Sequence, residues 1–309
     1  MNNADNLRYE KPRLSIMLIA NPTAGKAGEK KICQVADYLR DEGASVDVCI
    51  TRKRGDALEA ATKAARGSQA KKTDCIAAAG GDGTINEVVN GIAGSSVPMG
   101  VIPLGTVNLF ALETGIPMDA LKACDVILRG EVKEVRVGMV NGRRFMLMAG
   151  VGFDADVVYR LHLGLKRKLG RLSYVLTGLG RLAGYSYNRL SIELDGEAME
   201  GYSVIIGNMK YYGGRLSITP LADFEKEKLD VCVFKGRGAF NMLRYAWGVF
   251  NKRHLLYDDV EYRTVMTLKV SSNKKTYIQI DGDTFGTLPA EFKKARETVR
   301  VILPAVSGN

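Results

Sequence analysis

The sequence predicts an α/β protein with an N-terminal domain built on a doubly wound parallel sheet and a C-terminal domain that is mainly an antiparallel β-sandwich. Up to about residue 130, strand patterns alternate with helical patterns, which is typical of βαβ units. Beyond residue 131, strand patterns dominate and are separated by turn signals. The 309 residues are 46% hydrophobic and 25% charged, which is enough for two globular cores.

Each element of the first half has a simple signature. The run LSIMLIA at 14–20 is continuously apolar, as expected of a strand buried on both faces. The helical pattern at 29–42 ends at Gly43, a common helix terminator. The cycle then repeats, with strands at 45–51, 73–80 and 98–103, helices at 56–66 and 84–94, and closing helical patterns at 106–114 and 118–129.

The second half consists mainly of strand patterns. Asn141-Gly142 is a strong hairpin signal within 131–150, and a second hairpin is predicted at 190–208. Further strands are predicted in LDVCVFKG, TLKVSS, TYIQIDGD and VRVILP, and helical patterns lie near 166–184 and 238–251. We therefore predict an α/β domain at 1–132, rejoined by 288–309, and a β-rich domain at 133–287, with a ligand cleft between them.

Composition narrows the classes of partner and compartment. The net charge of +10 favours an anionic partner, yet no RNP stretch, KH loop or zinc-finger spacing indicates nucleic acid. The first residues show no secretory leader, and no stretch approaches the roughly 20 apolar residues of a membrane span. Five widely separated cysteines indicate neither a disulfide framework nor a zinc site. We expect a cytoplasmic protein.

The stretch AGGDGTINEVVNG at 79–91 places an acid in a glycine-rich turn between a strand and a helix. Such turns usually receive anions, which Asp82 would repel, unless Mg²⁺ bridges its carboxylate to phosphate oxygens. The pattern is neither a Walker A loop nor a complete G-x-G-x-x-G. Thr84 and Glu87 also fit a capping box, T-x-x-E, so ordinary helix-start chemistry explains them equally well.

Two further loops follow neighbouring strands of the predicted sheet. PLGTVN at 103–108 and NPTAG at 21–25 would lie at the same carboxyl-terminal edge as the GGDG turn. Each loop alone is an ordinary turn. Three such loops at one edge of the sheet favour a nucleotide site.

The motifs NPTAGK, GGDGTINEVVNG and GVIPLGTVN resemble, in order and spacing, those of the diacylglycerol kinase catalytic-domain family. This family includes bacterial lipid kinases and the sphingosine and ceramide kinases. The similarity runs from about residue 14 to residue 303. GGDG by itself is shared with NAD kinases and phosphofructokinases, but the flanking motifs favour the lipid-kinase branch.

The resemblance implies transfer of the γ-phosphoryl group of ATP, with Mg²⁺, to a hydroxyl of diacylglycerol, a sphingoid base or ceramide. The N-terminal domain would bind the nucleotide, with Asp82 organising Mg²⁺, and the C-terminal domain would bind the lipid. The nucleotide contacts implied by the family are Asn21, Pro22, Thr23, Ala24, Gly25, Thr51, Gly81, Asp82, Gly83, Thr84, Ile85, Asn86, Glu87 and Thr106. Arg167 and Lys168 are implied to approach the triphosphate, although a basic segment of this kind is more often a solvated or membrane-facing surface.

The reaction also needs a group that accepts the proton of the attacking hydroxyl. His162 and His254 lie in unremarkable contexts, so a carboxylate is the better candidate. QIDGDTFGTLP at 279–289 supplies Asp281 and Asp283, although D-G is also a hairpin turn. The family has D-G-E here, with the Glu as the usual proton acceptor. Asp283 replaces that Glu with a shorter side chain, which makes Asp281 a rival.

Three departures from the family pattern bear on the substrate and on a second metal. Arg136 and Leu109 stand where bacterial diacylglycerol kinases usually carry acids, and Lys226 falls where a ligand Asp of their auxiliary Mg²⁺ loop would be. We therefore expect that the auxiliary site is absent. We also do not transfer the substrate of a bacterial diacylglycerol kinase to this chain.

The segment at 237–253 is a candidate for membrane contact. It places Phe240, Leu243, Trp247 and Phe250 on one helical stripe, with basic residues nearby and no acids. The alternative is the core-facing side of a packed helix. We expect peripheral contact with the inner face of the membrane, and the sequence leaves a homodimer open.

Two other functions remain compatible with the sequence. An NAD kinase-like phosphotransferase would act on a soluble nucleotide. A non-catalytic lipid- or nucleotide-binding regulator would bind without turnover, and the altered acids make it conceivable.

Overall fold

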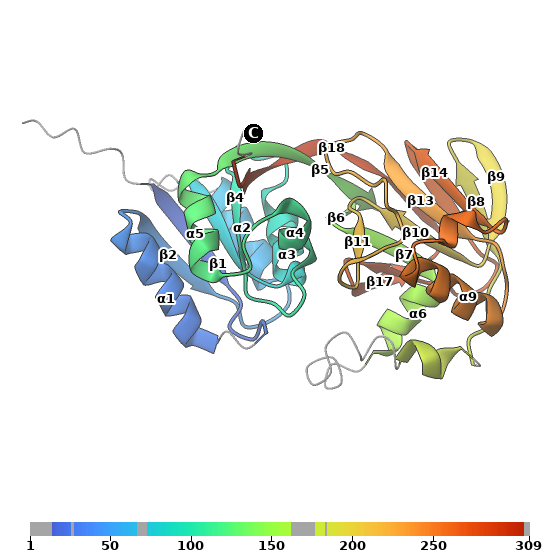
Figure 1. Cartoon of the computed structure of the whole chain (residues 1–309). Helices are drawn as coiled ribbons and strands as arrows, with labels where there is room; N and C mark the ends of the chain where they lie inside the picture. Colours follow the sequence, from blue (N-terminus) through green and yellow to red (C-terminus); the bar gives the residue numbers. More distant parts are fainter. Residues whose placement is uncertain (1–13, 26–27, 67–72, 162–176, 183, 306–309) are drawn as a thin grey trace, which may run out of the picture.

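A computed structural model describes residues 14–25, 28–66, 73–161, 177–182 and 184–305, and Figure 1 shows two lobes joined by long strands. The N-terminal lobe contains a parallel array in the order β2-β1-β3-β4. Its strands are β1 (Ser15–Ala20), β2 (Ser45–Ile50), β3 (Cys75–Gly80) and β4 (Met99–Pro103). Every residue of β3 and β4 is buried, as their unbroken apolar patterns predict.

Helices cover both faces of this parallel array. They are α1 (Gly28–Asp41), α2 (Asp56–Arg66), α3 (Asp82–Ile92), α4 (Leu109–Thr114) and α5 (Ala120–Arg129). The buried sides of α1 and α5 share one hydrophobic cluster, and those of α2 and α3 share another. The predicted doubly wound α/β architecture is confirmed.

The C-terminal lobe is a β-sandwich. One layer is an antiparallel sheet in the order β14-β13-β10-β7-β16-β17. Its strands are β7 (Met148–Gly152), β10 (Ser203–Gly207), β13 (Leu229–Phe234), β14 (Val260–Val265), β16 (Tyr277–Ile280) and β17 (Asp283–Thr287). The other layer contains β8 (Leu190–Leu194), β9 (Glu197–Gly201) and β15 (Thr267–Ser271). Apolar residues from both layers form a single buried core.

Two long strands, β5 (Glu131–Val140) and β18 (Ala290–Leu303), connect the lobes (Figure 1). They pair with each other almost throughout, with a register shift between Lys294 and Thr298. The first part of β18 pairs antiparallel with β15, and Val301 lies beside Met99 of β4. The lobes are therefore joined by a continuous hydrogen-bonded ladder.

Several short elements complete the chain. They are β6 (Arg143–Phe145), α6 (Phe153–Arg160), β11 (Tyr211–Tyr212), β12 (Leu216–Ser217), α9 (Ala239–Phe250) and η1 (His254–Leu256). The sequence did not predict α6 or β14. The helical pattern predicted near 166–184 lies mostly outside the described residues. Within the described ranges, no helix combines the length and apolar character that a membrane crossing needs, and all five cysteines are free.

We predict that Phe292→Ala lowers the free energy of unfolding by about 3–5 kcal/mol, because it removes a fully buried ring from the sandwich core. Since β18 pairs with strands of both lobes, urea unfolding followed by far-UV circular dichroism should stay a single transition. Arg296→Ala, an exposed change on the same strand, is the control and should have an effect within about 0.5 kcal/mol. A separate early transition in the Phe292 variant would show that the lobes unfold independently.

Candidate active site

A cleft of about 430 Å³ lies between the lobes, at the carboxyl ends of β1, β3 and β4. This volume is within the usual range for small-molecule sites, roughly 300–1,000 Å³. One wall is made of the three glycine-containing loops that follow these strands. The other wall comes from the C-terminal lobe and includes Leu147, Met148, Val158, Tyr212 and Leu216.

The glycine-rich loops pack against one another backbone to backbone. A Cβ at Gly105 would lie 2.6 Å from the Cα of Gly81. Gly25 has φ +58°, and a Cβ there would lie 2.5 Å from the carbonyl oxygen of Leu104. Glycine is needed at these positions because any side chain would separate the loops.

The carboxylate of Asp82 faces the beginning of a helix. Its Oδ2 accepts a hydrogen bond from the backbone N–H of Leu109 at 3.0 Å, and its Oδ1 accepts one from Phe110 at 3.1 Å. These N–H groups belong to the first turn of α4, where the helix dipole favours a negative charge. The acid in the GGDG turn is therefore stabilised by the next helix, and it also lines the cleft.

Asn108 closes the loop that precedes α4. It has a left-handed backbone conformation with φ 53°. Its side-chain oxygen accepts from Gly105 N, and its amide donates to Gly105 O, both at 2.9 Å. Asn108 was not predicted from the sequence as a site residue, although an Asn directly before a helix was an available signal.

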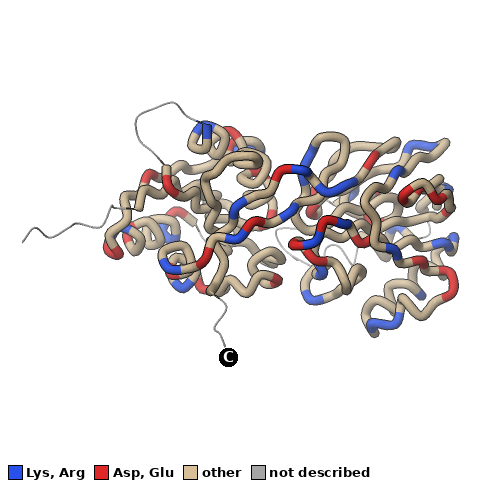
Figure 2. The backbone as a smooth tube through the Cα atoms, turned by 90° about the horizontal axis from the view of Figure 1, so that it is seen from above, with Lys and Arg blue, Asp and Glu red and all other residues tan. Residues whose placement is uncertain are grey.

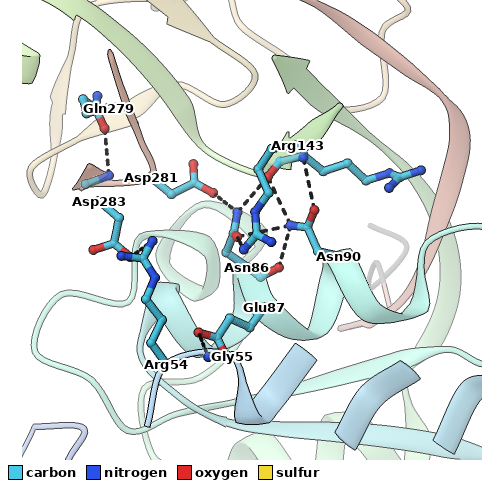
Figure 3. Close-up of polar contacts among 11 residues, drawn as sticks. Arg54, Gly55, Asn86, Glu87, Asn90, Arg143, Gln279, Asp281 and Asp283 are labelled. Atoms are coloured by element: carbon cyan, nitrogen blue, oxygen red, sulfur yellow. Dashed lines mark hydrogen bonds and ion pairs between the residues drawn. The ribbon is translucent and has the colours of Figure 1, made fainter. Parts of the chain in front are cut away.

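The predicted capping box at Thr84 and Glu87 is wrong. Helix α3 begins at Asp82 with Gly81 as its N-cap, and no side chain caps it. The carboxylate of Glu87 points instead to α2, where it accepts from Gly55 N at 2.9 Å and Ala57 N at 3.2 Å (Figure 3). The glutamate caps a neighbouring helix, which spacing within one helix does not reveal.

Asp281 lies in the β16–β17 turn with φ 50°, is partly buried between the lobes and lines the cleft (Figure 3). Its carboxylate accepts hydrogen bonds from the backbone N–H groups of Met146, Leu147 and Met148 at 2.8, 2.8 and 3.1 Å. The side-chain amide of Asn86 donates a fourth at 2.7 Å. Burial raises the pKa of Asp281 to about 6, and the four donors oppose that rise.

Other polar contacts fix the orientation of the two lobes. Asn86 and Asn90 lie one turn apart on α3, and both donate to the carbonyl oxygen of Arg144 in β6, at 3.2 and 3.1 Å. Glu113, at the end of α4, accepts from the backbone N–H groups of Lys210 and Tyr211 at 2.7 and 2.9 Å. Much of the motif after GGDG therefore serves the contact between the lobes.

Asp283 has a different environment from Asp281. Its side chain is 45% exposed and forms an ion pair with Arg54, with 3.5 Å between Nη2 and Oδ2 (Figure 3). Oδ2 lies 3.9 Å from the position that a Cβ on Gly83 would occupy. Of the two acids in the D-G-D turn, Asp283 is the one whose carboxylate is open to the cleft.

Asp154 is a partly buried acid that was not predicted from the sequence as a site residue. Its carboxylate accepts hydrogen bonds from the Tyr212 hydroxyl and from Gln279 Nε2, the latter at 2.8 Å. The other amide atom of Gln279, Oε1, accepts from Gly282 N at 2.9 Å. Asp154 therefore positions the D-G-D turn through Gln279. Burial raises the pKa of Asp154 to about 6.

The structure brings together ten of the residues predicted from the sequence. Those that line the cleft are Asn21, Ala24, Gly25, Gly81, Asp82, Gly83, Thr84, Thr106, Asp281 and Asp283. Arg167 and Lys168 lie outside the described residues. The lining residues that were not predicted from the sequence are Gly105, Val107, Asn108, Leu109, Leu147, Met148, Val158, Tyr212, Gly213, Leu216, Gln279 and Gly282. Most of these are apolar or glycine, and such residues look like core or turn positions in a sequence.

Six predicted nucleotide contacts do not line the cleft: Pro22, Thr23, Thr51, Ile85, Asn86 and Glu87. Ile85 is fully buried in the core of the N-terminal lobe, and Thr51 is buried with its hydroxyl directed to Ala20 O at 3.3 Å. Thr23 donates from its N–H and its hydroxyl to the side chain of Asn21, both at 2.9 Å. Such contacts stabilise the loops and the core of the N-terminal lobe, and a role of these six residues in nucleotide binding stays a prediction.

The donor set at the cleft fits a Mg²⁺ ion that shares phosphate ligands. Asp82 and Asp283 supply the carboxylate oxygens that this ion prefers. Among the described residues, no group of three or more His, Cys, Asp or Glu side chains could hold a metal by itself. A cation here would therefore need additional oxygens from a bound triphosphate.

The segment 221–230, where the resemblance places an auxiliary Mg²⁺ loop, does not fit such an ion. The Nζ of the buried Lys294 donates to the carbonyl oxygen of Asp223 at 3.2 Å. Arg136 forms an ion pair with Glu227 at 3.0 Å. Burial lowers the pKa of Lys294 to about 8, so the amine is still mostly charged near neutral pH. Cationic side chains thus reach the oxygens that would otherwise face a metal.

Comparison with known proteins gives a consistent result along most of the chain. The family model of the diacylglycerol kinase catalytic domain matches residues 15–140, and that of the YegS C-terminal NAD kinase beta sandwich-like domain matches residues 148–303. A diacylglycerol kinase of Bacillus subtilis is 34% identical over 295 residues, covering 93% of this chain and 95% of that protein. One of Staphylococcus saprophyticus is 30% identical over 292 residues, covering 93% and 94%.

A solved structure has the same fold. The crystal structure of a diacylglycerol kinase from Bacillus anthracis matches 95% of this chain and 98% of its own, with a TM-score of 0.70 and 20% sequence identity.

The two acids of the D-G-D turn should differ in their effect on stability. Asp281→Asn should lower the free energy of unfolding by about 2–4 kcal/mol, because its amide group would face buried N–H donors. Asp283→Asn, on a half-exposed side chain, should change it by less than about 1 kcal/mol. Chemical denaturation of both variants measures this contrast. Equal effects would contradict the division of roles between the two carboxylates.

The stability contribution of Asp154 should fall as pH rises between about 4 and 6, because its pKa lies near 6 in the folded state and near 3.8 ordinarily. The folded state then binds the proton more tightly, and it loses this advantage once the carboxyl ionises. As pH rises over that interval, the free energy of unfolding of Asp154→Asn should increase relative to that of the wild type by on the order of 2–3 kcal/mol. Urea unfolding of both proteins at several pH values tests this, and a pH-independent difference would contradict it.

Proposed function

Because the chain belongs to the diacylglycerol kinase catalytic-domain family, we propose that it is an ATP-dependent lipid kinase. It would transfer the γ-phosphoryl group of ATP to a hydroxyl of diacylglycerol, a sphingoid base or ceramide. We further propose that it works as a peripheral protein at the inner face of the membrane. The family supports the kinase class, and the nature of the two cleft walls supports a lipid acceptor.

The observation that carries the proposal is the contrast between the two walls of the cleft. The N-terminal wall offers closely packed glycine loops and the carboxylate of Asp82, which suit a metal-bound triphosphate. The C-terminal wall offers apolar side chains such as Leu147, Met148 and Leu216, which suit a lipid chain. Asp283 lies at the Gly83 side of the cleft, on a turn of the C-terminal lobe.

In the proposed reaction, the carboxylate of Asp283 accepts the proton of the lipid hydroxyl. The hydroxyl oxygen forms a bond to the γ-phosphorus while the bond from that phosphorus to the β–γ bridging oxygen breaks, and ADP leaves. Mg²⁺ carried by the triphosphate would be held near Asp82 and would neutralise charge on the phosphate oxygens. Arg54 keeps the carboxylate of Asp283 oriented through their ion pair.

Asp283 is the better candidate for proton acceptor because all four hydrogen bonds of Asp281 are structural. A carboxylate with four donors has little capacity left to accept a proton from substrate. Asp283 has one described cationic partner and an exposed edge. The loss of one methylene relative to the family's Glu is a difference in reach that a substitution can test.

We predict that Asp283→Asn lowers kcat by about 10²–10⁴-fold, because it removes the proton acceptor. Asp283→Glu should retain much of the activity, since it keeps the charge. Asp82→Asn should also lower kcat by orders of magnitude, and it should lose about 1 kcal/mol of stability because Asp82 caps α4. Asp37→Asn, an exposed acid on α1, is the matched control.

The measurement is transfer of labelled γ-phosphate from ATP, with Mg²⁺, to diacylglycerol, a sphingoid base or ceramide in mixed micelles, with NAD as a parallel soluble acceptor. A labelled lipid in the wild type that is lost in Asp283→Asn supports the proposal and identifies the acceptor. Labelled NAD without labelled lipid would instead support the NAD kinase-like alternative. ATP binding without transfer to any acceptor would favour a regulator.

A further inference from the structure

Helix α9 presents an exposed apolar face to solvent. Its members, together with one residue of the following η1 turn, are Phe240, Leu243, Trp247, Phe250 and Leu256, and we refer to them as the α9 face. Phe240 is 78% exposed, Trp247 66% and Phe250 67%. The rings of Trp247 and Phe250 stack on each other with centroids 6.1 Å apart. Exposed aromatic groups of this kind usually mark an interaction surface.

The opposite side of α9 already provides the packing that the fold requires. Met242, Tyr245 and Val249 are buried in a cluster with strands of the antiparallel sheet. The hydroxyl of Tyr245 donates to Asp259 at 2.5 Å and also accepts from Gly236 N at 2.7 Å. The α9 face is therefore additional to the core side of the helix, and the fold gives it no covering element among the described residues.

The segment that carries the α9 face contains basic residues and no acidic ones, and the first acids after it are Asp258 and Asp259. Residues 237–257 contain no Asp or Glu. Arg237, Lys252 and Arg253 are exposed at the two ends of the helix, and Arg244 is paired with Asp259. Figure 2 shows that elsewhere Lys and Arg are interspersed with Asp and Glu over both lobes. A basic rim around exposed aromatic groups matches an anionic, partly apolar surface.

The α9 face lies close to the cleft in the fold. Strand β12 contacts α9, and its Leu216 lines the cleft while remaining 38% exposed. The η1 turn is attached to the same segment through a hydrogen bond between His254 Nε2 and Ile218 O at 2.9 Å. Phe153 of α6 packs against the hydrophobic cluster that contains the buried side of α9, and Val158 of α6 also lines the cleft. A binding partner that contacts the α9 face would thus lie near the apolar wall of the cleft.

We propose that the α9 face docks onto an anionic lipid bilayer, with the aromatic rings at the headgroup level and the basic ends on lipid phosphates. This inference rests on the proposed lipid kinase function and names the surface through which the enzyme reaches its substrate. Tryptophan suits such a position, because it has an apolar body and one polar N–H. The flanking charges add attraction that high salt screens.

The chain provides its own reporter, because Trp247 is its only tryptophan. The full chain is mixed with vesicles of equimolar phosphatidylcholine and phosphatidylglycerol, or of phosphatidylcholine alone. We expect co-sedimentation with the anionic vesicles, a blue shift of tryptophan emission and quenching by bromine-labelled acyl chains. Binding to neutral vesicles, or to anionic vesicles at high salt, should be weaker.

The test variant is Phe240→Ser with Phe250→Ser, which keeps Trp247 as the reporter. Its apparent affinity for the anionic vesicles should fall by about tenfold or more, since two large apolar groups are lost from the contact. The matched control is Met118→Ser with Val132→Ser, which removes two exposed apolar side chains from other elements. Unfolding curves of all the proteins should coincide, because each altered side chain is exposed.

The outcomes separate this inference from the proposed function. With a short-chain form of the lipid that the transfer assay identifies as acceptor, below its micelle concentration, the double variant should turn over like the wild type, whereas with vesicle-embedded substrate it should be slower. No quenching of Trp247, or equal losses in the test and control variants, would overturn the docking surface even if phosphate transfer is observed. A blue shift that depends on protein concentration without lipid would also overturn it, because a second copy would then cover the face.

Discussion

The partly buried carboxylate of Asp281 holds together the parts of the molecule on which the site depends. A charge taken out of water is destabilising unless donors replace its hydration, and here four donors do so. Three are consecutive backbone N–H groups that lead into β7, and the fourth is Asn86 of α3. Because these donors come from both lobes, satisfying one carboxylate fixes the position of the D-G-D turn relative to the glycine-rich loops.

The same constraint explains why two acids separated by one glycine have different roles. Asp281 points into the junction and is fully engaged, whereas Asp283 remains half-exposed beside Arg54. Asp154 stabilises this arrangement indirectly: it accepts a hydrogen bond from the amide of Gln279, whose oxygen accepts one from the N–H of Gly282 in the turn. This arrangement places Asp283, the proton acceptor that we propose, on a turn held by hydrogen bonds, and a proton acceptor needs such a defined position.

The C-terminal lobe carries two apolar surfaces that the fold does not need for its own core. One is the cleft wall with Leu147, Met148 and Leu216, and the other is the α9 face. Strand β12 contributes to the first and contacts the helix that bears the second. A kinase that acts on a membrane lipid requires both a polar wall for phosphate and an apolar route for the acceptor. The proposed function and the proposed docking surface are thus two consequences of one arrangement.

Sequence alone determined the features that depend on local periodicity and on glycine-rich turns. The alternation of strands and helices, the β-rich second half and the three loops at one sheet edge follow from neighbouring residues. Asn86 and Asp281 form a hydrogen bond although they are 195 residues apart in the chain, so no local pattern indicates that they meet.

The capping partner of Glu87, the buried position of Ile85 and the difference between Asp281 and Asp283 were likewise decided only by tertiary contacts. Helix α9 shows the reason most directly. Periodicity identified an aromatic stripe on the helix but could not tell whether another element covers it. Only the packing of Met242 and Val249 on the opposite side left that stripe exposed, because a helix buries whichever face its neighbours in space can reach.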